Sequence, residues 1–269
     1  MSFKMICLDL DGTLLNTEHR ITPYSKEVLR QLVEKGVHVV LVSSRMPAAI
    51  EKFYQELELT GPMISYGGAC AFVGGKAIPG GYIPMEGVEK IAQKAKELGI
   101  HLSIYQDADW YVDSMDYYAV QESNTVEVVP TVEPYSQLIP RLKAEGKGAS
   151  KLLPLGPAEG VVPFGEFLLA EMGEYVNAFI NSPTYIEVLP YGVDKAKGID
   201  VLCEHLGVEL SAVIAMGDTA TDLPMIRHAG LGIAMKNAEE DVHKQSDMVT
   251  EYTNAEEGCA RCLAKIFGL

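Results

Sequence analysis

Two pairs of aspartates stand where apolar runs of the chain end. Asp9 and Asp11 close the first run, and Asp218 and Asp222 follow the run Ala212–Met216. Carboxylates that emerge from buried strands are costly unless a cation or hydrogen-bond donors compensate them. Asp-Gly is a common turn dipeptide and Asp222 could cap a helix, but a turn does not explain Asp9 inside an apolar run. Carboxylates converging from two strand ends predict a hard cation, and Mg²⁺ fits best beside a phosphate.

A hydroxyl pair and a lysine could hold an anion beside these carboxylates. Ser43, Ser44 and Arg45 follow the apolar run Val37–Val42, where a hydroxyl and backbone N–H groups could bind an anion. Lys195 opens an expected helix and could point a compact positive charge into the same crevice. Each signal is weak by itself, because serines also cap helices and most lysines lie on the surface.

These residues require a sheet that brings strand ends together. Apolar runs alternate with amphipathic segments in residues 1–81 and again in 189–269, which predicts an α/β fold with parallel strands and helices on both sides. Helices are expected near 23–35, 47–57, 194–206, 222–229, 239–245 and from 255, and strands near 5–10, 37–42, 63–66, 212–216, 231–234 and 247–250. Since the two flanking pieces share one pattern, we expect them to form one discontinuous domain.

The segment between them follows a different pattern. Residues 82–188 mix helices with closely spaced strands, which predicts an inserted α+β domain with an antiparallel sheet. Helices are expected near 86–98, 134–144 and 158–172, and strands near 100–106, 110–113, 150–155, 175–181 and 185–189. The aromatic residues of this segment could face a substrate ring, although core packing explains them equally well: Tyr105, Trp110, Tyr111, Tyr117 and Tyr118.

The composition excludes several classes of protein. The chain has 269 residues, 48% hydrophobic and 22% charged, with a formal net charge of −15. This globular composition has no basic stripe, so neither nucleic acid nor an anionic membrane is an expected partner. No apolar run approaches the ~20 residues of a membrane span, and the N-terminal run is no signal peptide, which predicts a cytoplasmic protein. The five scattered cysteines fit reduced thiols, with Cys259 and Cys262 as ordinary helix residues rather than metal ligands.

Taken together, the four strand-end clusters resemble a known family. DLDGTLL at residue 9, SSR at residue 43, GVDKAKG at residue 192 and GDTATD at residue 217 look like the four motifs of the haloacid dehalogenase-like hydrolases, in that order. The insert between the second and third motifs resembles the α/β cap of the Cof-type sugar-phosphatase subfamily. The resemblance extends over the whole chain, including Ile233–Met235 and Asn254–Gly258. It implies a Rossmann-like core, 1–81 with 189–269, and a cap, 82–188, that selects the substrate.

The resemblance also implies catalytic roles. Asp9 would attack phosphorus and form an aspartyl-phosphate. Asp11 would protonate the leaving oxygen and then deprotonate the water that hydrolyses the intermediate. Ser43 and Lys195 would grip the transferring phosphoryl oxygens.

Further roles follow from the same resemblance. Mg²⁺ would be held by the Asp9 carboxylate, the Asp11 main-chain carbonyl and Asp218. Asp222 would orient Lys195 and a metal-bound water without touching the metal. The remaining expected phosphate- or substrate-binding residues are Gly12, Ser44, Arg45 and Thr221.

Three departures from the family pattern lie near the expected site. The usual Thr-Gly-Arg is Ser43-Ser44-Arg45, and Gly67 and Thr221 each replace an asparagine amide. The main hypothesis is a Mg²⁺-dependent phosphatase of small phosphorylated metabolites, such as sugar phosphates or related monoesters, acting as a monomer or small homo-oligomer. The alternatives are a phosphomutase or phosphotransferase on the same scaffold, or a catalytically weakened ligand-binding regulatory module.

Overall fold

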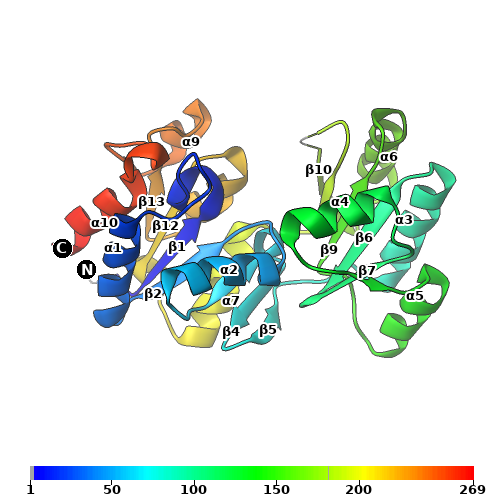
Figure 1. The fold of residues 1–269 in the computed structure, drawn as a ribbon, viewed down its shortest axis with the longest axis horizontal. Helices are drawn as coiled ribbons and strands as arrows, with labels where there is room; N and C mark the ends of the chain where they lie inside the picture. The colour runs from blue at the N-terminus through cyan, green and yellow to red at the C-terminus, as the bar shows by residue number, and fades with distance from the viewer. Residues whose placement is uncertain (1–2, 181) are drawn as a thin grey trace. The chain divides into compact units, whose positions relative to one another are not determined.

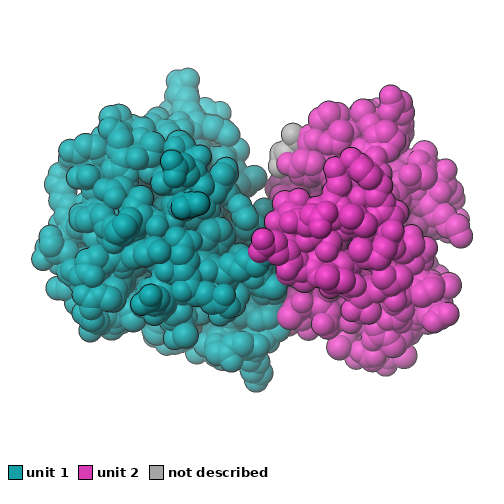
Figure 2. All heavy atoms as spheres, viewed as in Figure 1, with its two compact units in different colours: residues 1–78, 194–269 teal, residues 79–193 magenta. Residues whose placement is uncertain are grey.

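The computed structural model describes residues 3–180 and 182–269. The chain divides into two compact units, shown in different colours in Figure 2. One unit joins Met1–Ile78 to Asp194–Leu269 and is called the core; the other is Pro79–Val193 and is called the cap unit. Residue 181, the last residue of the strand expected at 175–181, lies outside the described residues. Among the described residues, no helix is both long and apolar enough to cross a membrane.

The core contains an eight-stranded sheet in the order β14-β13-β12-β1-β2-β3-β4-β5. Its strands are β1 (Met5–Asp9), β2 (His38–Val42), β3 (Met63–Ser65), β4 (Cys70–Val73), β5 (Lys76–Pro79), β12 (Val213–Gly217), β13 (Leu231–Ala234) and β14 (Met248–Val249). All pairs from β14 to β3 are parallel, and β4 runs antiparallel to β3. The expected α/β class with a parallel sheet is therefore confirmed. The sheet contains strands from both sides of the insert.

Helices pack on the core sheet and explain its long apolar runs. They are α1 (Pro23–Glu34), α2 (Pro47–Leu57), α7 (Lys195–Leu206), α8 (Leu223–His228), α9 (Glu240–Gln245) and α10 (Gly258–Phe267). Met5 and Cys7 of β1 belong to one buried cluster with Ile199 of α7 and Met225 of α8. The intervening residues Ile6 and Leu8 are fully buried as well, so β1 is covered on both faces, as a parallel strand usually is. Figure 1 shows α1 and α10 side by side, and the two helices are in contact.

Local sequence signals set the helix ends that flank the core strands. The Thr22 side chain accepts a hydrogen bond from the Ser25 N–H (3.2 Å), and Pro23 occupies the first turn, where its missing N–H costs nothing. Beyond the other end of α1, Gly36 has a φ of +78°, a left-handed conformation that favours glycine. The chain then turns directly into β2.

The cap unit contains a six-stranded sheet in the order β10-β11-β9-β6-β7-β8. Its strands are β6 (His101–Gln106), β7 (Asp109–Val112), β8 (Thr131–Val132), β9 (Lys151–Leu155), β10 (Val176–Phe179) and β11 (Glu187–Pro190). Its helices are α3 (Met85–Glu97), α4 (Tyr117–Val126), α5 (Tyr135–Ala144) and α6 (Ala158–Glu171). The pairs are antiparallel except β7 with β8. This confirms the expected α+β insert with an antiparallel sheet.

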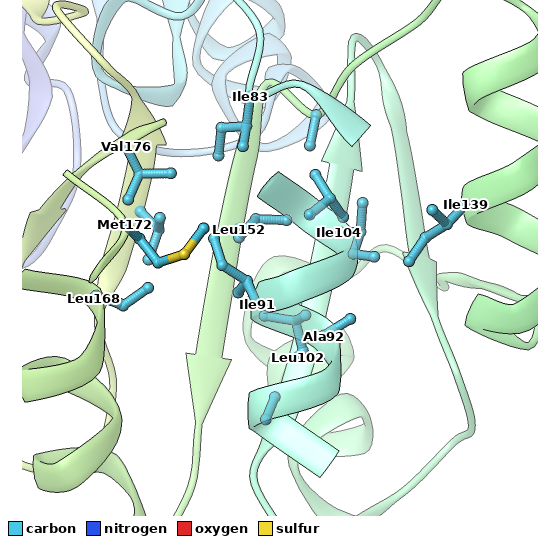
Figure 3. Packing of buried hydrophobic residues seen from close by; sticks show 14 of the residues in the cluster. Ile83, Ile91, Ala92, Leu102, Ile104, Ile139, Leu152, Leu168, Met172 and Val176 are labelled. Atoms are coloured by element: carbon cyan, nitrogen blue, oxygen red, sulfur yellow. The ribbon is translucent and has the colours of Figure 1, made fainter. Parts of the chain in front are cut away.

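An apolar cluster joins one face of this sheet to its helices. Figure 3 shows Leu102 and Ile104 of β6 and Leu152 of β9 packed with Ile91 of α3 and with Met172, which directly follows α6. All six residues of β6 are buried, so neither face of this central strand is open to solvent. The cap unit therefore has a hydrophobic core of its own.

Two elements of the cap unit, α4 and β8, were not predicted from the sequence. Ala119 is the only fully buried residue of α4, so the helix lacks the apolar periodicity by which helices are recognised. Its local signal is the N-cap Asp116, whose side chain accepts from the Ala119 N–H at 2.9 Å. Of the aromatic residues singled out above, Tyr105 and Trp110 stack as a buried cross-strand pair with ring centroids 5.7 Å apart. Packing therefore accounts for these two aromatic residues.

The two cysteines of the CxxC sequence are free thiols on α10. Cys259 is buried and contacts Met216 of β12 through sulfur, at 3.8 Å. Burial raises the pKa of Cys262 to about 11, which keeps this thiol protonated at neutral pH. These surroundings are those of ordinary helix residues.

Candidate active site

Three neighbouring strands of the core end beside one another and position the polar residues. Asp9 is the last residue of β1 and pairs in register with Val42, so Ser43 leaves β2 at the same level. On the other side of β1, the strand β12 ends at Gly217, and Asp218 follows. Parallel strands present their carboxyl ends at one edge of a sheet, which is why residues far apart in sequence meet here.

Lys195 lies between two of the aspartates, Asp9 and Asp222, and binds both of them. Its ammonium group donates to Asp9 Oδ1 at 2.6 Å and to Asp222 Oδ1. All three side chains are nearly or fully buried, with 7%, 12% and 0% of the Lys195, Asp9 and Asp222 side chains exposed. Lys195 is the first residue of α7, and the Asp194 carboxylate caps that helix by accepting from the Lys197 N–H at 3.1 Å. The helix start therefore fixes the lysine on the sheet edge.

A close backbone approach allows α7 to begin at this point. Gly68 follows β3 with a φ of +111°, and a Cβ at this position would lie 1.9 Å from the Asp194 carbonyl oxygen. Only glycine provides both the backbone conformation and the space. The short turn after β3 therefore decides how near Lys195 comes to Asp9.

The site holds more negative than positive charge. Burial raises the pKa of the Asp9 carboxyl to about 8, although Lys195 opposes the shift. Burial, together with the charge of Asp222, raises the pKa of Asp218 to about 6. Burial alone would lower the pKa of Lys195, but Asp9 and Asp222 raise it above its usual range. One lysine thus leaves the carboxylates only partly compensated, as expected of a site that takes a cation.

The arrangement of the carboxylates fits a hard cation. Asp9, Asp218 and Asp222 each offer an oxygen atom, and these atoms lie within 4.8 Å of one another. Asp222 is already engaged by Lys195 and by the N–H groups of Asp218 and Thr219, each 3.0 Å from Oδ2. Asp9 and Asp218 are therefore the more available ligands, and an all-oxygen set suits Mg²⁺.

Gly12 leaves room for Asp218. A Cβ at Gly12 would lie 2.1 Å from Asp218 Oδ2, and the residue has a φ of +79°. On its other oxygen, Asp218 accepts from the Thr13 hydroxyl at 3.2 Å. The turn after β1 thus sets the place of a carboxylate that the chain supplies about two hundred residues later.

The Asp11 carboxylate is turned toward Arg45. The guanidinium group donates to both carboxylate oxygens, with Arg45 Nη2 2.8 Å from Asp11 Oδ1 and 2.8 Å from Oδ2. Asp11 is not among the carboxylates that come together around Asp9, and its side chain is 46% exposed. A role for Arg45 in binding phosphate stays a prediction, because here its guanidinium group is paired with Asp11.

The remaining predicted residues lie around the same sheet edge. Ser43 is buried, and its Oγ accepts from the Arg45 N–H at 3.2 Å. The Ser43 carbonyl accepts from the Gly67 N–H at 3.0 Å. Gly67, which stands where the family usually has asparagine, has a φ of +59°, and glycine adopts this conformation without strain. Ser44 is partly buried, and Thr221 is exposed with its hydroxyl 2.8 Å from that of Thr219. Their binding roles stay predictions.

Comparison with known proteins now decides the family. Residues 6–263 match the model of the haloacid dehalogenase-like hydrolase family. The chain belongs to this family. It is 30% identical to a haloacid dehalogenase-like hydrolase of Bacteroides thetaiotaomicron, whose structure superposes with a TM-score of 0.86 over 99% of this chain and 100% of that one.

Two further relatives carry more specific names. A 5-amino-6-(5-phospho-D-ribitylamino)uracil phosphatase of Bacillus subtilis is 27% identical over 98% of each chain. The solved structure of a sugar phosphatase of subclass IIB of the superfamily is 27% identical, with a TM-score of 0.77, and the match covers 98% of this chain and 99% of that one. The resemblance to a phosphatase subfamily with an inserted cap is therefore confirmed.

Two asparagines that the sequence analysis assigned no role support the DLDGT turn of this haloacid dehalogenase-like hydrolase. The Asn237 side-chain amide donates to the Gly12 carbonyl oxygen at 2.8 Å, and its oxygen accepts from the Asn254 N–H at 2.9 Å. Asn254 in turn donates to the Leu15 carbonyl at 2.9 Å. Neither residue lies in one of the four motifs, so only the fold reveals their connection to the site.

Proposed function

We propose that this protein is a Mg²⁺-dependent phosphatase of small phosphorylated metabolites, sugar phosphates or related monoesters, that acts through an aspartyl-phosphate on Asp9. The observation that carries the proposal is the buried Asp9 carboxylate at the end of β1, held by Lys195 and close to Asp218. The names of the two phosphatases described above support the substrate class.

The metal ligands would be the carboxylates of Asp9 and Asp218 and the main-chain carbonyl of Asp11. When bound, Mg²⁺ would neutralise charge between the phosphate and the nucleophile. Lys195 holds Asp9 through Oδ1 and so fixes the direction in which the carboxylate faces the phosphorus. Asp222 keeps the lysine in place, because it is fully buried and accepts from two backbone N–H groups as well.

The proposed reaction consists of two exchanges of bonds at phosphorus. A bond forms from an Asp9 oxygen to phosphorus while the bond to the leaving oxygen breaks, and Asp11 supplies the proton that the leaving oxygen takes up. Asp11 then removes a proton from water as the water oxygen attacks phosphorus, which releases phosphate and restores the Asp9 carboxylate. Ser43 Oγ accepts from the Arg45 N–H, so its own proton is available to a phosphoryl oxygen. Lys195, Gly12, Ser44 and Thr221 would complete the phosphate site.

The cap unit, Pro79–Val193, is proposed to select among phosphate esters. The predicted cap, 82–188, lies within this unit, and both of its boundaries stay predictions. The two relatives named above differ in substrate, which fits a shared phosphate site combined with a variable recognition unit.

A substrate panel tests the proposal. The wild-type protein with Mg²⁺ should hydrolyse p-nitrophenyl phosphate and at least one of a set of sugar, nucleotide and cofactor phosphates, and a chelator should abolish turnover. Asp9→Asn should lose turnover because an amide is a poor nucleophile, whereas Asp241→Asn, on the exposed face of α9, should keep it.

Product analysis separates the alternatives. Free phosphate is the product of a phosphatase, whereas a bisphosphate or an isomerised phosphate would indicate a transferase or mutase. A wild-type protein that hydrolyses no ester of the panel in the presence of Mg²⁺ contradicts the proposal. Tight binding of a phosphate ester without turnover would indicate the ligand-binding module instead.

A further inference from the structure

Arg45 and Asp11 form the most completely bonded ion pair at the edge of the core sheet. Three donor–acceptor contacts join them: Arg45 Nη2 lies 2.8 Å from each carboxylate oxygen, and Nε lies 3.2 Å from Oδ2. A planar guanidinium fork that meets a carboxylate in this way fixes its orientation as well as its charge. The other neighbour of Asp11, His19, lies 3.3 Å away with a side chain that is 75% exposed, so it constrains the carboxylate less.

Two hydrogen bonds fix the backbone of Arg45, and one aromatic ring contacts its guanidinium group. The Arg45 N–H donates to Ser43 Oγ at 3.2 Å, and the Arg45 carbonyl accepts from the Tyr66 N–H at 3.1 Å. The guanidinium carbon lies 5.6 Å from the centre of the Phe53 ring of α2, within the range of a cation–π contact. The backbone of Arg45 is therefore held beside the ends of β2 and β3, and Phe53 of α2 lies next to the guanidinium group that pairs with Asp11.

The two aspartates of the DLDGT turn, Asp9 and Asp11, thus pair with different basic side chains. Asp9 faces Lys195 and is nearly buried, with 12% of its side chain exposed. Asp11 faces Arg45, is 46% exposed and lies outside the group formed by the Asp9, Asp218 and Asp222 carboxylates. Among the described residues, Arg45 and the exposed His19 are the side chains that bind the Asp11 carboxylate, so without Arg45 only His19 would hold it away from the other three carboxylates.

We propose that Arg45 is a positioning residue that holds the Asp11 carboxyl group on the exposed side of the site, where it can reach the leaving oxygen of the substrate. Both Asp11 oxygens accept from Arg45, so one of these contacts has to open before Asp11 can carry the proton that it donates. The inference rests on the proposed phosphatase function, in which Asp11 moves the proton. The departing alcohol is the large and variable part of a phosphate ester, so the group that protonates it has to stand on the open side of the site. Asp11 does so because Arg45 holds it there, and Asp9 remains alone as the nucleophile.

The dependence of rate on the leaving group tests this role. In a mechanism with an enzyme-bound phosphoryl group, kcat/KM covers only the steps up to release of the alcohol, the steps in which Asp11 donates its proton. General acid catalysis contributes about 10²–10⁴-fold where the leaving group needs a proton, and little where it does not. Arg45→Gln should lower kcat/KM about 100-fold for an alkyl phosphate and no more than about threefold for p-nitrophenyl phosphate. Arg45→Lys, which keeps the charge without the fork, should lie between the wild type and Arg45→Gln.

Two controls distinguish positioning from a structural effect. Arg30→Gln removes another ion-paired arginine of the core, on the exposed face of α1, and should leave both substrates unaffected. In an Asp11→Asn background, Arg45→Gln should have little further effect on the alkyl ester, since its target is already gone.

Two outcomes overturn the inference. Arg45→Gln could lower kcat/KM by one factor for both esters, which would mean that the guanidinium group grips the phosphoryl group. Its effect could also be as large in the Asp11→Asn background as in the wild type. Either result contradicts the role of Arg45 but not the proposed phosphatase function. The phosphatase function itself would be contradicted if the wild-type protein hydrolysed no phosphate ester.

Discussion

Substituting Gly12 by alanine tests the geometry of the site most directly. The glycine lies in the turn after β1 with a φ of +79°, and the added Cβ would come within 2.1 Å of Asp218 Oδ2 and 2.7 Å of its Cγ. Ordinary contacts of a Cβ begin at 3.4 Å, so the Asp218 carboxylate has to retreat by about 1 Å or the turn has to open.

Two separate costs follow from this substitution. An alanine held in the left-handed region loses roughly 1–2 kcal/mol of stability, equivalent to a fall of a few degrees in melting temperature for a chain of this size. Displacing Asp218 by about 1 Å should lower kcat/KM about 100-fold, because catalytic groups tolerate little misplacement. The concentration of Mg²⁺ that gives half-maximal activity should rise about tenfold, since Asp218 is a proposed ligand.

Gly36→Ala is the matched control. Gly36 has nearly the same φ, +78°, but no atom lies within 4 Å of the added Cβ. It should lose a similar amount of stability and keep kcat/KM within about twofold of the wild type. Thermal melting, steady-state turnover of p-nitrophenyl phosphate and a Mg²⁺ titration of both variants provide the comparison. If Gly12→Ala matched Gly36→Ala in turnover and in Mg²⁺ requirement, the reasoning that Gly12 makes room for a metal-binding Asp218 would be refuted.

Three further predictions concern the same cluster. In the folded, metal-free protein, burial raises the pKa of Asp9 to about 8 and that of Asp218 to about 6, so both carboxyl groups keep their protons up to those pH values. In the unfolded chain, both groups lose their protons near the ordinary aspartate pKa of 3.8. Stability should therefore fall as pH rises through these values, and Mg²⁺, which replaces the protons, should raise the melting temperature more at pH 8 than at pH 5.5; a shift independent of pH would contradict this. Lys195→Met removes the ammonium group from the buried Asp9 and Asp222, so the free energy of unfolding in urea titrations should fall by about 3–5 kcal/mol. A loss below about 1 kcal/mol would show that the hydrogen bonds left to Asp222 and the hydration of Asp9 compensate for the lost cation. Asn237→Ala removes the donor to the Gly12 carbonyl, so turnover should fall about tenfold with a stability loss near 1 kcal/mol, and unchanged turnover would show that the turn holds itself in place.

Much of the core could be predicted from local sequence. The apolar runs that became β1, β2, β12 and β13 are buried on both faces, and such strands read as continuous hydrophobic stretches. Thr22 with Pro23 marks the start of α1 because capping and proline chemistry act within one turn of the chain. By contrast, α4 was missed because it buries little besides Ala119 and so shows no apolar stripe.

The sequence by itself determined which residues could meet. Asp9 ends an apolar strand, and Ser43 and Asp218 each follow one. Parallel strands in one sheet place their carboxyl ends at one edge, so the set of candidate residues follows from the order of the chain. The family resemblance added roles to these residues, and its fold is the one observed.

Only the tertiary structure decided how these residues are partnered. The resemblance implied that Asp222 orients Lys195, but the hydrogen bond from Lys195 to Asp9 and the pairing of Arg45 with Asp11 depend on the turns after β1, β2 and β3. Asn237 reaches Gly12 across 225 positions of sequence. Such contacts depend on distances between distant segments, which hydrophobic periodicity and local capping signals do not encode, and so they become visible only once the sheet has brought the segments together.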